Sequence, residues 1–214
     1  MHNQGQRDYF EGLLAKHGNS YLALDWNSPE SQKLRYIILS QILQFSAKSV
    51  DLSLLDVGCG FGDLFDFLRS QKLLASHNIS YLGYDISDKI LAVAKKNYPD
   101  AKFEHKDLLL ETDVPHVDFI FASGIFNIRV LPKDEHHNFV KEMLQRMYEL
   151  ANYGVAVNFL SENGVSISDI DDLNSGRYFC FKVEDLAEFS RALTNRFIIR
   201  HDYHQGDFTL YLLK

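Results

Sequence analysis

The sequence predicts an α/β fold, a doubly wound and mostly parallel β-sheet with helices on both faces, from three observations. Short apolar runs typical of buried strands alternate with helical stretches along the middle of the 214-residue chain. Such alternation implies parallel strands joined by crossover helices. The last two β-rich runs, 197–203 and 208–213, are joined only by 204–207, which permits an antiparallel hairpin and is too short for a parallel crossover.

Each expected element follows from a local pattern. A short helix at 8–16 ends near Gly18, and a longer one within 27–47 starts with Ser28 as N-cap and Pro29 in the first helical position. Apolar runs predict strands at 53–57, 80–84, 117–122 and 155–159, and a weaker strand at 101–105. Further helices are expected at 63–74, 88–97, 133–151 and 183–195. The connection 161–182 is long, as lids and binding loops often are.

Composition narrows the classes of protein. The formal net charge of −7 argues against a partner bound through its phosphates, because nucleic-acid binders usually present a basic face. Two cysteines, Cys59 and Cys180, cannot form a disulfide framework or a cysteine-rich metal site. No apolar run approaches the length of a membrane span. We therefore expect a soluble protein of the cytoplasm.

The sequence LLDVGCGFGDL, from Leu54 to Leu64, places three glycines on alternate positions directly after the first expected strand. Gly58 and Gly60 can adopt positive φ and let a ligand approach the main chain, and Gly62 would let the next helix pack closely on the strand. Dinucleotides and S-adenosylmethionine both bind in this way. The spacing departs from the dinucleotide pattern G-x-G-x-x-G, because Asp63 occupies the third position after Gly60.

Two further acids follow expected strands. Asp85 ends the second strand, where its carboxylate can accept two hydrogen bonds from a ribose diol, with Ile86 against the adenine. The alternative for Asp85 is the N-cap of the next helix, a role for which Ser87 competes. Asp107 follows the weaker strand, where it can accept from an adenine amino group while the Leu108 N–H serves a ring nitrogen; the alternative is a surface turn acid.

In this combination the sequence resembles the class I S-adenosylmethionine-dependent methyltransferases, through LLDVGCGFG at 54–62, YLGYDIS at 81–87, FEHKDLL at 103–109 and VDFIFASGIF at 117–126. The resemblance covers about 28–214. It implies a Rossmann-like seven-stranded sheet with an antiparallel C-terminal hairpin. It also implies S-adenosylmethionine as cofactor, with S-adenosylhomocysteine as product.

The resemblance further implies roles for individual residues. Gly58, Cys59 and Gly60 would contact the methionyl part through the main chain, and Asp56 would orient the loop or the amino group. Ser123, at the end of the fourth strand, would approach the methionyl amino group or carboxylate.

Other expectations concern the surroundings of the cofactor. We expect one methyltransferase domain, with 51–214 as the cofactor-binding core, 1–50 as a helical extension over the site and 161–182 as a substrate loop. Arg35 would pair with the methionyl carboxylate; the alternative is a surface helix charge or a salt bridge. Phe126, Asn127 and Asn158 are the candidates for the acceptor side, although Asn158 could equally cap a turn.

The resemblance implies in-line methyl transfer, and we expect a small-molecule acceptor. The alternatives are a non-catalytic partner or sensor that binds the cofactor, and a protein methyltransferase. Family members that methylate nucleic-acid bases carry an Asp/Asn-Pro-Pro-Tyr/Phe motif after the fourth strand, and Ser123–Phe126 lacks it. The sequence leaves the oligomeric state open.

No metal is expected. His136 and His137 are adjacent and would diverge on a helix, whereas His201 and His204 would point to opposite faces of a strand. The acidic run 169–172 departs from a calcium loop at its third ligand position. We therefore expect all of these residues to be solvated.

Overall fold

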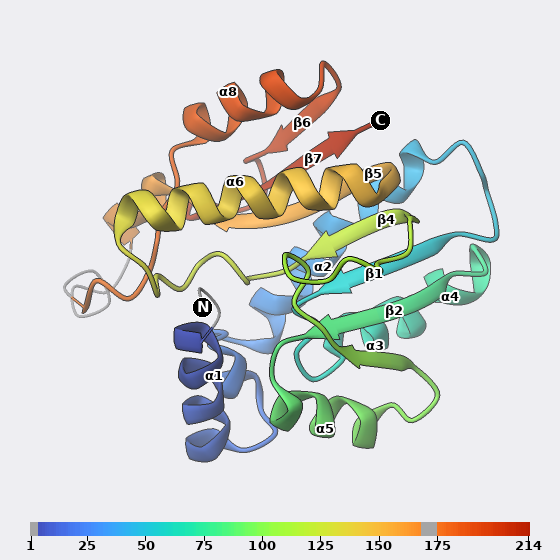
Figure 1. Ribbon diagram of the computed structural model, residues 1–214, viewed down its shortest axis with the longest axis horizontal. Coiled ribbons are helices and arrows are strands. Elements are labelled where there is room, and N and C mark those ends of the chain that lie inside the picture. Colours follow the sequence, from blue (N-terminus) through green and yellow to red (C-terminus); the bar gives the residue numbers. More distant parts are fainter. Residues whose placement is uncertain (1–3, 168–174) are drawn as a thin grey trace.

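The computed structural model describes residues 4–167 and 175–214 and contains a seven-stranded sheet with the order β3-β2-β1-β4-β5-β7-β6 (Figure 1). The strands are β1 Ser53–Val57, β2 Ser80–Asp85, β3 Lys102–His105, β4 Val117–Ala122, β5 Ala151–Leu160, β6 Phe197–Arg200 and β7 Asp207–Leu213. β1 to β5 are parallel, and β7 runs antiparallel to both β5 and β6. The predicted Rossmann-like sheet with an antiparallel C-terminal hairpin is confirmed.

The helices surround this sheet. The α-helices are α1 Gln4–His17, α2 Pro29–Ser40, α3 Asp63–Ser70, α4 Leu73–Ser76, α5 Asp88–Asn97, α6 Lys133–Leu150 and α8 Val183–Leu193. Short 3-10 helices lie at η1 Tyr21–Leu24, η2 Gln41–Phe45 and η3 Glu162–Ile167. Ser28 is the predicted N-cap of α2, because its side chain accepts a hydrogen bond from the Ser31 N–H at 3.0 Å.

Several element boundaries differ from the prediction. The helix expected at 63–74 is broken into α3 and α4, because Lys72 adopts a left-handed conformation with φ of 60°. The strand expected at 155–159 is longer, since β5 pairs with β4 on one side and β7 on the other. The run expected as a strand at 197–203 stops at Arg200, whose guanidinium binds the Asp202 carboxylate at 2.8 Å in the following turn.

Two apolar layers hold the helices on opposite faces of the sheet. α6 and α8 pack on one face, through residues such as Leu144 and Leu186, each with 0% of its surface exposed. α2, α3 and α5 pack on the other face, through residues such as Leu39 and Leu68. β1 supplies both layers in alternation, because successive side chains of a strand point to opposite faces.

One edge of the sheet collects the ends of six strands. The carboxyl ends of β1 to β5 lie there because these strands are parallel, and the arrowheads of β1, β2 and β4 point toward the side on which α1 lies (Figure 1). β7 runs the other way, so its first residue, Asp207, pairs with Leu160 at the end of β5. This edge is where open parallel sheets bind ligands. No helix in the described residues is both long enough and apolar enough to cross a membrane.

Candidate functional site

A cavity of about 600 Å³ lies along this edge of the sheet. Its floor consists of residues that follow β1 to β5 and precede β7. Its cover comes from the amino-terminal part of the chain, through Gln6, Arg7 and Phe10 of α1, Leu24 to Asn27 near η1, and Ser31, Arg35 and Tyr36 of α2. The volume lies in the range of small-ligand sites, about 300–1,000 Å³.

The glycine turn lies at the centre of the cavity floor. Gly58, Gly60 and Gly62 have φ of 73°, 57° and 85°, a region that only glycine enters freely. A Cβ on Gly58 would lie 2.2 Å from Ile125 Cγ2, so this position has no room for a side chain. A Cβ on Gly62 would meet the rings of Tyr98 and Phe103 at 2.7 and 2.8 Å. We expected Gly62 to let the next helix pack closely on the strand. In the structure it makes room for two aromatic rings instead.

The N–H groups of the turn have partners inside the protein. Gly58 and Cys59 both donate to the Tyr84 carbonyl, at 2.8 and 2.9 Å, and Gly60 donates to Asp85 Oδ2 at 3.1 Å. These bonds fasten the end of β1 to the end of β2. At Gly58, Cys59 and Gly60 the main-chain groups left for a ligand are carbonyl oxygens, which accept hydrogen bonds and favour a cation; the Cys59 carbonyl already accepts one from the Gly62 N–H at 3.0 Å.

Asp85 faces the cavity at the end of β2. Its two carboxylate oxygens accept from the N–H groups of Gly60 and Ser87, at 3.1 and 3.0 Å. Ser87 is the N-cap of α5, since its Oγ accepts from the Ile90 N–H at 3.3 Å, so Asp85 does not have that role. Burial raises the pKa of Asp85 to about 6 against the opposing effect of these N–H donors.

Asp56 is a second buried carboxyl group in the cavity wall. Tyr81 donates its hydroxyl to Asp56 Oδ2 at 2.7 Å, yet burial raises the pKa of Asp56 to about 7. No lysine or arginine of the described residues forms an ion pair with Asp56 or Asp85. Both carboxyl groups lack the positive charge that would compensate their burial.

The end of β3 supplies the next part of the wall. Asp107 and Leu108, which follow β3, line the cavity together with Ile86, which follows β2. Asp107 Oδ1 accepts from the Leu109 N–H at 3.1 Å, so the carboxylate also stabilises its own turn. This position is compatible with both roles that the sequence left open for Asp107, a contact with the adenine amino group and an acid that stabilises a surface turn.

The end of β4 brings Ser123 to the cavity. Its hydroxyl oxygen is buried and has no hydrogen-bond partner. A buried hydroxyl without a partner is costly, which makes it a natural contact for a polar ligand.

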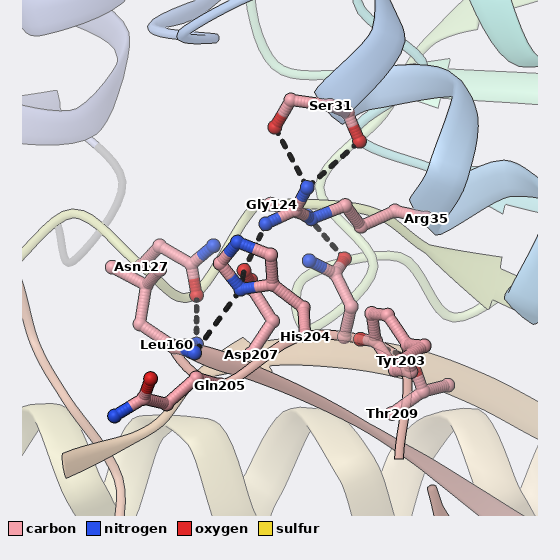
Figure 2. Close-up of polar contacts among 12 residues, drawn as sticks. Ser31, Arg35, Gly124, Asn127, Leu160, Tyr203, His204, Gln205, Asp207 and Thr209 are labelled. Atoms are coloured by element: carbon pink, nitrogen blue, oxygen red, sulfur yellow. Dashed lines mark hydrogen bonds and ion pairs between the residues drawn. The ribbon is translucent and has the colours of Figure 1, made fainter. Parts of the chain in front are cut away.

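Arg35 is a buried residue, with 5% of its surface exposed, and it lines the cavity. Its guanidinium forms an ion pair with Asp207 and donates to Ser31 O and Oγ at 2.9 and 2.7 Å (Figure 2). The sequence left two alternatives to a cofactor contact for Arg35, a salt bridge and a charge on the helix surface. The structure contains the salt bridge, and the burial of Arg35 excludes the surface charge. Arg35 thereby joins α2 to the start of β7.

Of the three acceptor-side candidates, Asn127 lines the cavity, and its Oδ1 accepts from the Leu160 N–H at 3.0 Å. Phe126 and Asn158 do not reach the cavity, which corrects our expectation for both. Phe126 is fully buried in the core and stacks on Phe159 with ring centroids 5.7 Å apart. Asn158 caps a turn, the second of its two readings, because its Oδ1 accepts from the Gly124 N–H at 2.9 Å.

Asp207 and His204, which no sequence motif identified, also line the cavity, with His204 Nδ1 3.0 Å from Asp207 Oδ2. The sequence did contain a signal for their position, because an antiparallel last strand must begin at the edge where the parallel strands end.

His201 and His204 were expected in a strand, but they lie in the link before β7. The expected solvation is also wrong for His136, which is 1% exposed and bonds the Phe126 carbonyl at 2.9 Å.

The described residues contain no cluster of three or more His, Cys, Asp or Glu side chains that could hold a metal. The acidic run 169–172 lies outside the described residues.

Comparisons with known proteins agree with this geometry. A family model described as a methyltransferase domain matches residues 54–149, which include the glycine turn, Asp85 and Asp107. Rv1506c of Mycobacterium tuberculosis, provisionally described as a methyltransferase, is 24% identical over 164 residues, which are 76% of this chain and 93% of that protein.

Solved structures share the fold. Magnesium protoporphyrin IX methyltransferase from Synechocystis PCC 6803, with bound S-adenosylhomocysteine, superposes with a TM-score of 0.66 at 14% identity and covers 100% of both chains. The plantazolicin methyltransferase BamL, in complex with a triazolic analog and S-adenosylhomocysteine, gives a TM-score of 0.68 at 13% identity, covering 100% of this chain and 96% of its own. The motifs, the family-model match over residues 54–149 and the shared fold together support a class I S-adenosylmethionine-dependent methyltransferase.

Proposed function

We propose that this protein transfers the methyl group of S-adenosylmethionine to a small-molecule acceptor. The observation that carries the proposal is a single cavity that joins the glycine turn and two buried, uncompensated carboxyl groups to a second polar cluster beyond β4. One end suits a cationic nucleoside, and the other leaves room for an acceptor beside it.

The residues around the glycine turn fit the methionyl part of the cofactor. Asp56 and the carbonyl oxygens of the turn would accept hydrogen bonds from its ammonium group, which supplies the positive charge that the buried carboxyl groups lack. The turn's N–H groups are engaged within the protein, so we assign the contacts of Gly58, Cys59 and Gly60 to carbonyl oxygens. The hydroxyl of Ser123 would gain its missing partner from the same ligand.

The residues at the ends of β2 and β3 fit the adenosyl part. Each oxygen of Asp85 accepts one protein N–H bond and keeps capacity for another, so the carboxylate can hold both ribose hydroxyl groups. Ile86 would lie against one face of the adenine. Asp107 would accept a hydrogen bond from the adenine amino group, and the Leu108 N–H would donate one to a ring nitrogen.

The chemistry asks mainly for alignment. When bound, the sulfonium supplies a methyl carbon that is already activated toward nucleophiles. The chain must therefore hold the acceptor in line with the S–CH3 bond and exclude water, and positioning of this kind contributes about 7–11 kcal/mol. In this proposal Arg35 forms part of the cavity wall, and its charge pairs with Asp207 and not with the cofactor.

The cover of the cavity favours a small acceptor over a protein side chain. Gln6 of α1 donates to the Ile125 carbonyl at 2.6 Å, and Glu11 of α1 accepts from Ser87 Oγ at 2.8 Å. Glu11 also binds Lys89 at 2.6 Å. These contacts fasten α1 over the strand ends, which supports the role of 1–50 as a cover on the 51–214 core.

The test uses Trp26, which is the single tryptophan of the chain and lines the cavity. We expect S-adenosylmethionine and S-adenosylhomocysteine to change its fluorescence saturably. Methyl-labelled S-adenosylmethionine should then label members of a panel of small hydroxyl, amine, thiol and carboxyl compounds. Binding without transfer to any of them contradicts a small-molecule methyltransferase and favours a cofactor-binding sensor or partner. Label found only on added protein favours a protein methyltransferase.

A further inference from the structure

His204 and Asp207 form a pair at the end of the cavity farthest along the sheet from Asp107. Asp207 is 2% exposed, and the Arg35 guanidinium on its other side offsets the cost of burying its charge. The side chain of His204 is 40% exposed, and Asn127 and Arg35 line the same cavity. One ring nitrogen, Nδ1, lies 3.0 Å from Asp207 Oδ2.

The sheet order places this pair on the acceptor side of the cofactor site. The strand ends at this edge of the sheet, which we call the tips, follow the sheet order from β3 to β7. The cavity residues at these tips are Asp107, Asp85, Gly58, Ser123, Leu160 and Asp207. If the adenosine occupies the first two tips and the methionyl part the next two, the sulfonium lies near the centre. The space beyond β4 then belongs to the acceptor, and its polar groups come from the ends of β5 and β7.

The lining of the cavity also includes apolar and aromatic side chains, namely Ile128, Phe139, Met143, Leu160 and Tyr178. An acceptor that fits would be an apolar or aromatic molecule with one polar reacting group. Apolar side chains beside that group limit its hydration, so a proton-accepting side chain becomes important.

We propose that His204 is the general base that removes the proton of an aromatic hydroxyl group during methyl transfer, and that Asp207 orients it. This inference rests on the proposed function and deepens it by naming the acceptor class, a phenol or related hydroxyaryl compound. When the ring proton is on Nδ1, which lies 3.0 Å from Asp207 Oδ2, the lone pair of Nε2 is free to act as the base.

A second neighbour of Nδ1 bears on this tautomer. The Gly206 N–H lies 3.1 Å from Nδ1 and would favour the opposite tautomer, with the proton on Nε2. A hydrogen bond to a carboxylate is about twice as strong as one between neutral groups, so Asp207 prevails over Gly206. The same carboxylate stabilises the imidazolium once the ring has taken up the acceptor's proton.

The acceptor O–H bond breaks and its proton moves to His204 Nε2, while the oxygen electron pair forms the new O–CH3 bond. The S–CH3 bond breaks and leaves its electron pair on sulfur, which becomes a neutral thioether. The imidazolium then loses the proton to solvent through the exposed part of the ring.

Other titratable groups near the pair do not compete for this proton. Burial and the charges of Glu162 and Asp207 raise the pKa of Cys180. Burial and the charge of Asp207 also raise the pKa of Tyr203. Both groups stay neutral near pH 7, which leaves the imidazole of His204 as the proton acceptor of this cluster.

The first measurement is spectroscopic and needs no turnover. 4-Nitrophenol is added to the complex with S-adenosylhomocysteine, its binding is followed by Trp26 fluorescence, and its ionisation by phenolate absorbance against pH. We expect the bound phenol of the wild type to ionise at lower pH than that of H204Q, by about one pH unit. The histidine control is H137Q, because His137 lies on α6 and does not line the cavity.

The second measurement is kinetic, on the hydroxyaryl compounds that the wild type methylates. H204Q should lower kcat about 100-fold or more at pH 7, with recovery at high pH as the acceptor ionises by itself. The affinity for S-adenosylhomocysteine should stay within about twofold, because His204 lies outside the proposed cofactor contacts. H137Q should behave as wild type. D207N is a second variant, but it leaves Arg35 unpaired, so H204Q decides if D207N does not fold.

Three outcomes overturn the inference. The first is an H204Q enzyme with unchanged kcat and pH profile. The second is bound 4-nitrophenol that ionises at the same pH in the wild type and in H204Q. The third is wild-type transfer confined to amines, thiols or carboxylates. In these cases the methyltransferase itself stands. Transfer to no acceptor at all contradicts the proposed function, and the inference with it.

Discussion

The two ends of the cavity are built in different ways. The cofactor end, from β1 to β3, consists of short motifs that each follow one strand: the glycine turn, Asp85, and Asp107 with Leu108. The acceptor end is assembled from distant parts of the chain. Arg35 of α2 meets Asp207 of β7 across 172 positions, and Asn127 bonds the end of β5.

This difference has a physical reason. A cofactor shared by many reactions needs main chain and carboxylates at fixed strand tips, and a parallel sheet supplies those tips from local sequence. An acceptor pocket needs a shape and a polar group for one molecule, and long-range packing supplies both. Mutations at the cofactor end should therefore affect binding of any nucleoside ligand, whereas those at the acceptor end should affect transfer alone.

The largest effect is expected at Gly58. An alanine there must adopt positive φ, at about 1–2 kcal/mol, and its Cβ would lie 2.2 Å from Ile125 Cγ2, an overpacking of about 1–3 kcal/mol. We expect Gly58→Ala to lower the free energy of unfolding by about 2–5 kcal/mol and to abolish binding of S-adenosylhomocysteine. Denaturant unfolding and Trp26 fluorescence measure the two effects.

Gly60→Ala is the matched control for this variant. It shares the positive φ, but its Cβ would meet the flexible end of Leu24 at 3.1 Å. It should therefore be the milder substitution. Adding Ile125→Ala to Gly58→Ala should restore part of the lost stability. Equal losses at Gly58 and Gly60 would show that backbone strain alone, and not the contact with Ile125, makes the turn bare.

A smaller effect is expected at Asp85. Asp85→Ala removes one partner of the proposed ribose hydrogen bonds and should weaken the affinity for S-adenosylmethionine by about 1–3 kcal/mol. It also frees the N–H groups of Gly60 and Ser87, so a crystal structure of the variant should accompany calorimetry. Asn127→Ala is the control at the acceptor end and should leave cofactor affinity nearly unchanged. Unchanged affinity in Asp85→Ala removes this residue from the site.

The smallest effect is expected from pH. The pKa of Asp56 is raised to about 7 and that of Asp85 to about 6 by burial, so both are partly protonated in the free protein below pH 7. A cationic ligand favours the ionised forms, so binding must release these protons. Affinity for S-adenosylmethionine should fall at least about tenfold from pH 8 to pH 6, and less in Asp56→Asn. Flat calorimetric titrations across this range would contradict the proposed contacts with the ammonium group.

The same two groups set the sign of the pH dependence of stability. A carboxyl group whose pKa is higher in the folded than in the unfolded protein stabilises the fold fully only below the unfolded value, and this contribution is lost as pH rises. The ligand-free protein should therefore lose stability between about pH 4 and pH 7 through Asp56 and Asp85. Asp56→Asn should flatten this loss in thermal unfolding.

The sequence by itself determined the sheet, its antiparallel end and the bare glycine turn. These follow from local rules: apolar runs form buried strands, a short link forces a hairpin, and positive φ at Gly58 and Gly60 requires glycine. It also identified Ser87 as the competitor that leaves Asp85 free to face the cavity.

Only the tertiary structure decided which polar groups meet at the acceptor end. Phe126 follows β4 as Ser123 and Asn127 do, and Asn158 lies near the end of β5, yet packing buried Phe126 in the core and directed the Asn158 side chain to the Gly124 N–H. Arg35 meets Asp207 only because α2 lies across the sheet and β7 runs backward, a contact that depends on how whole elements pack. His204 lies three residues before Asp207, and the direction of β7 brings both to the cavity.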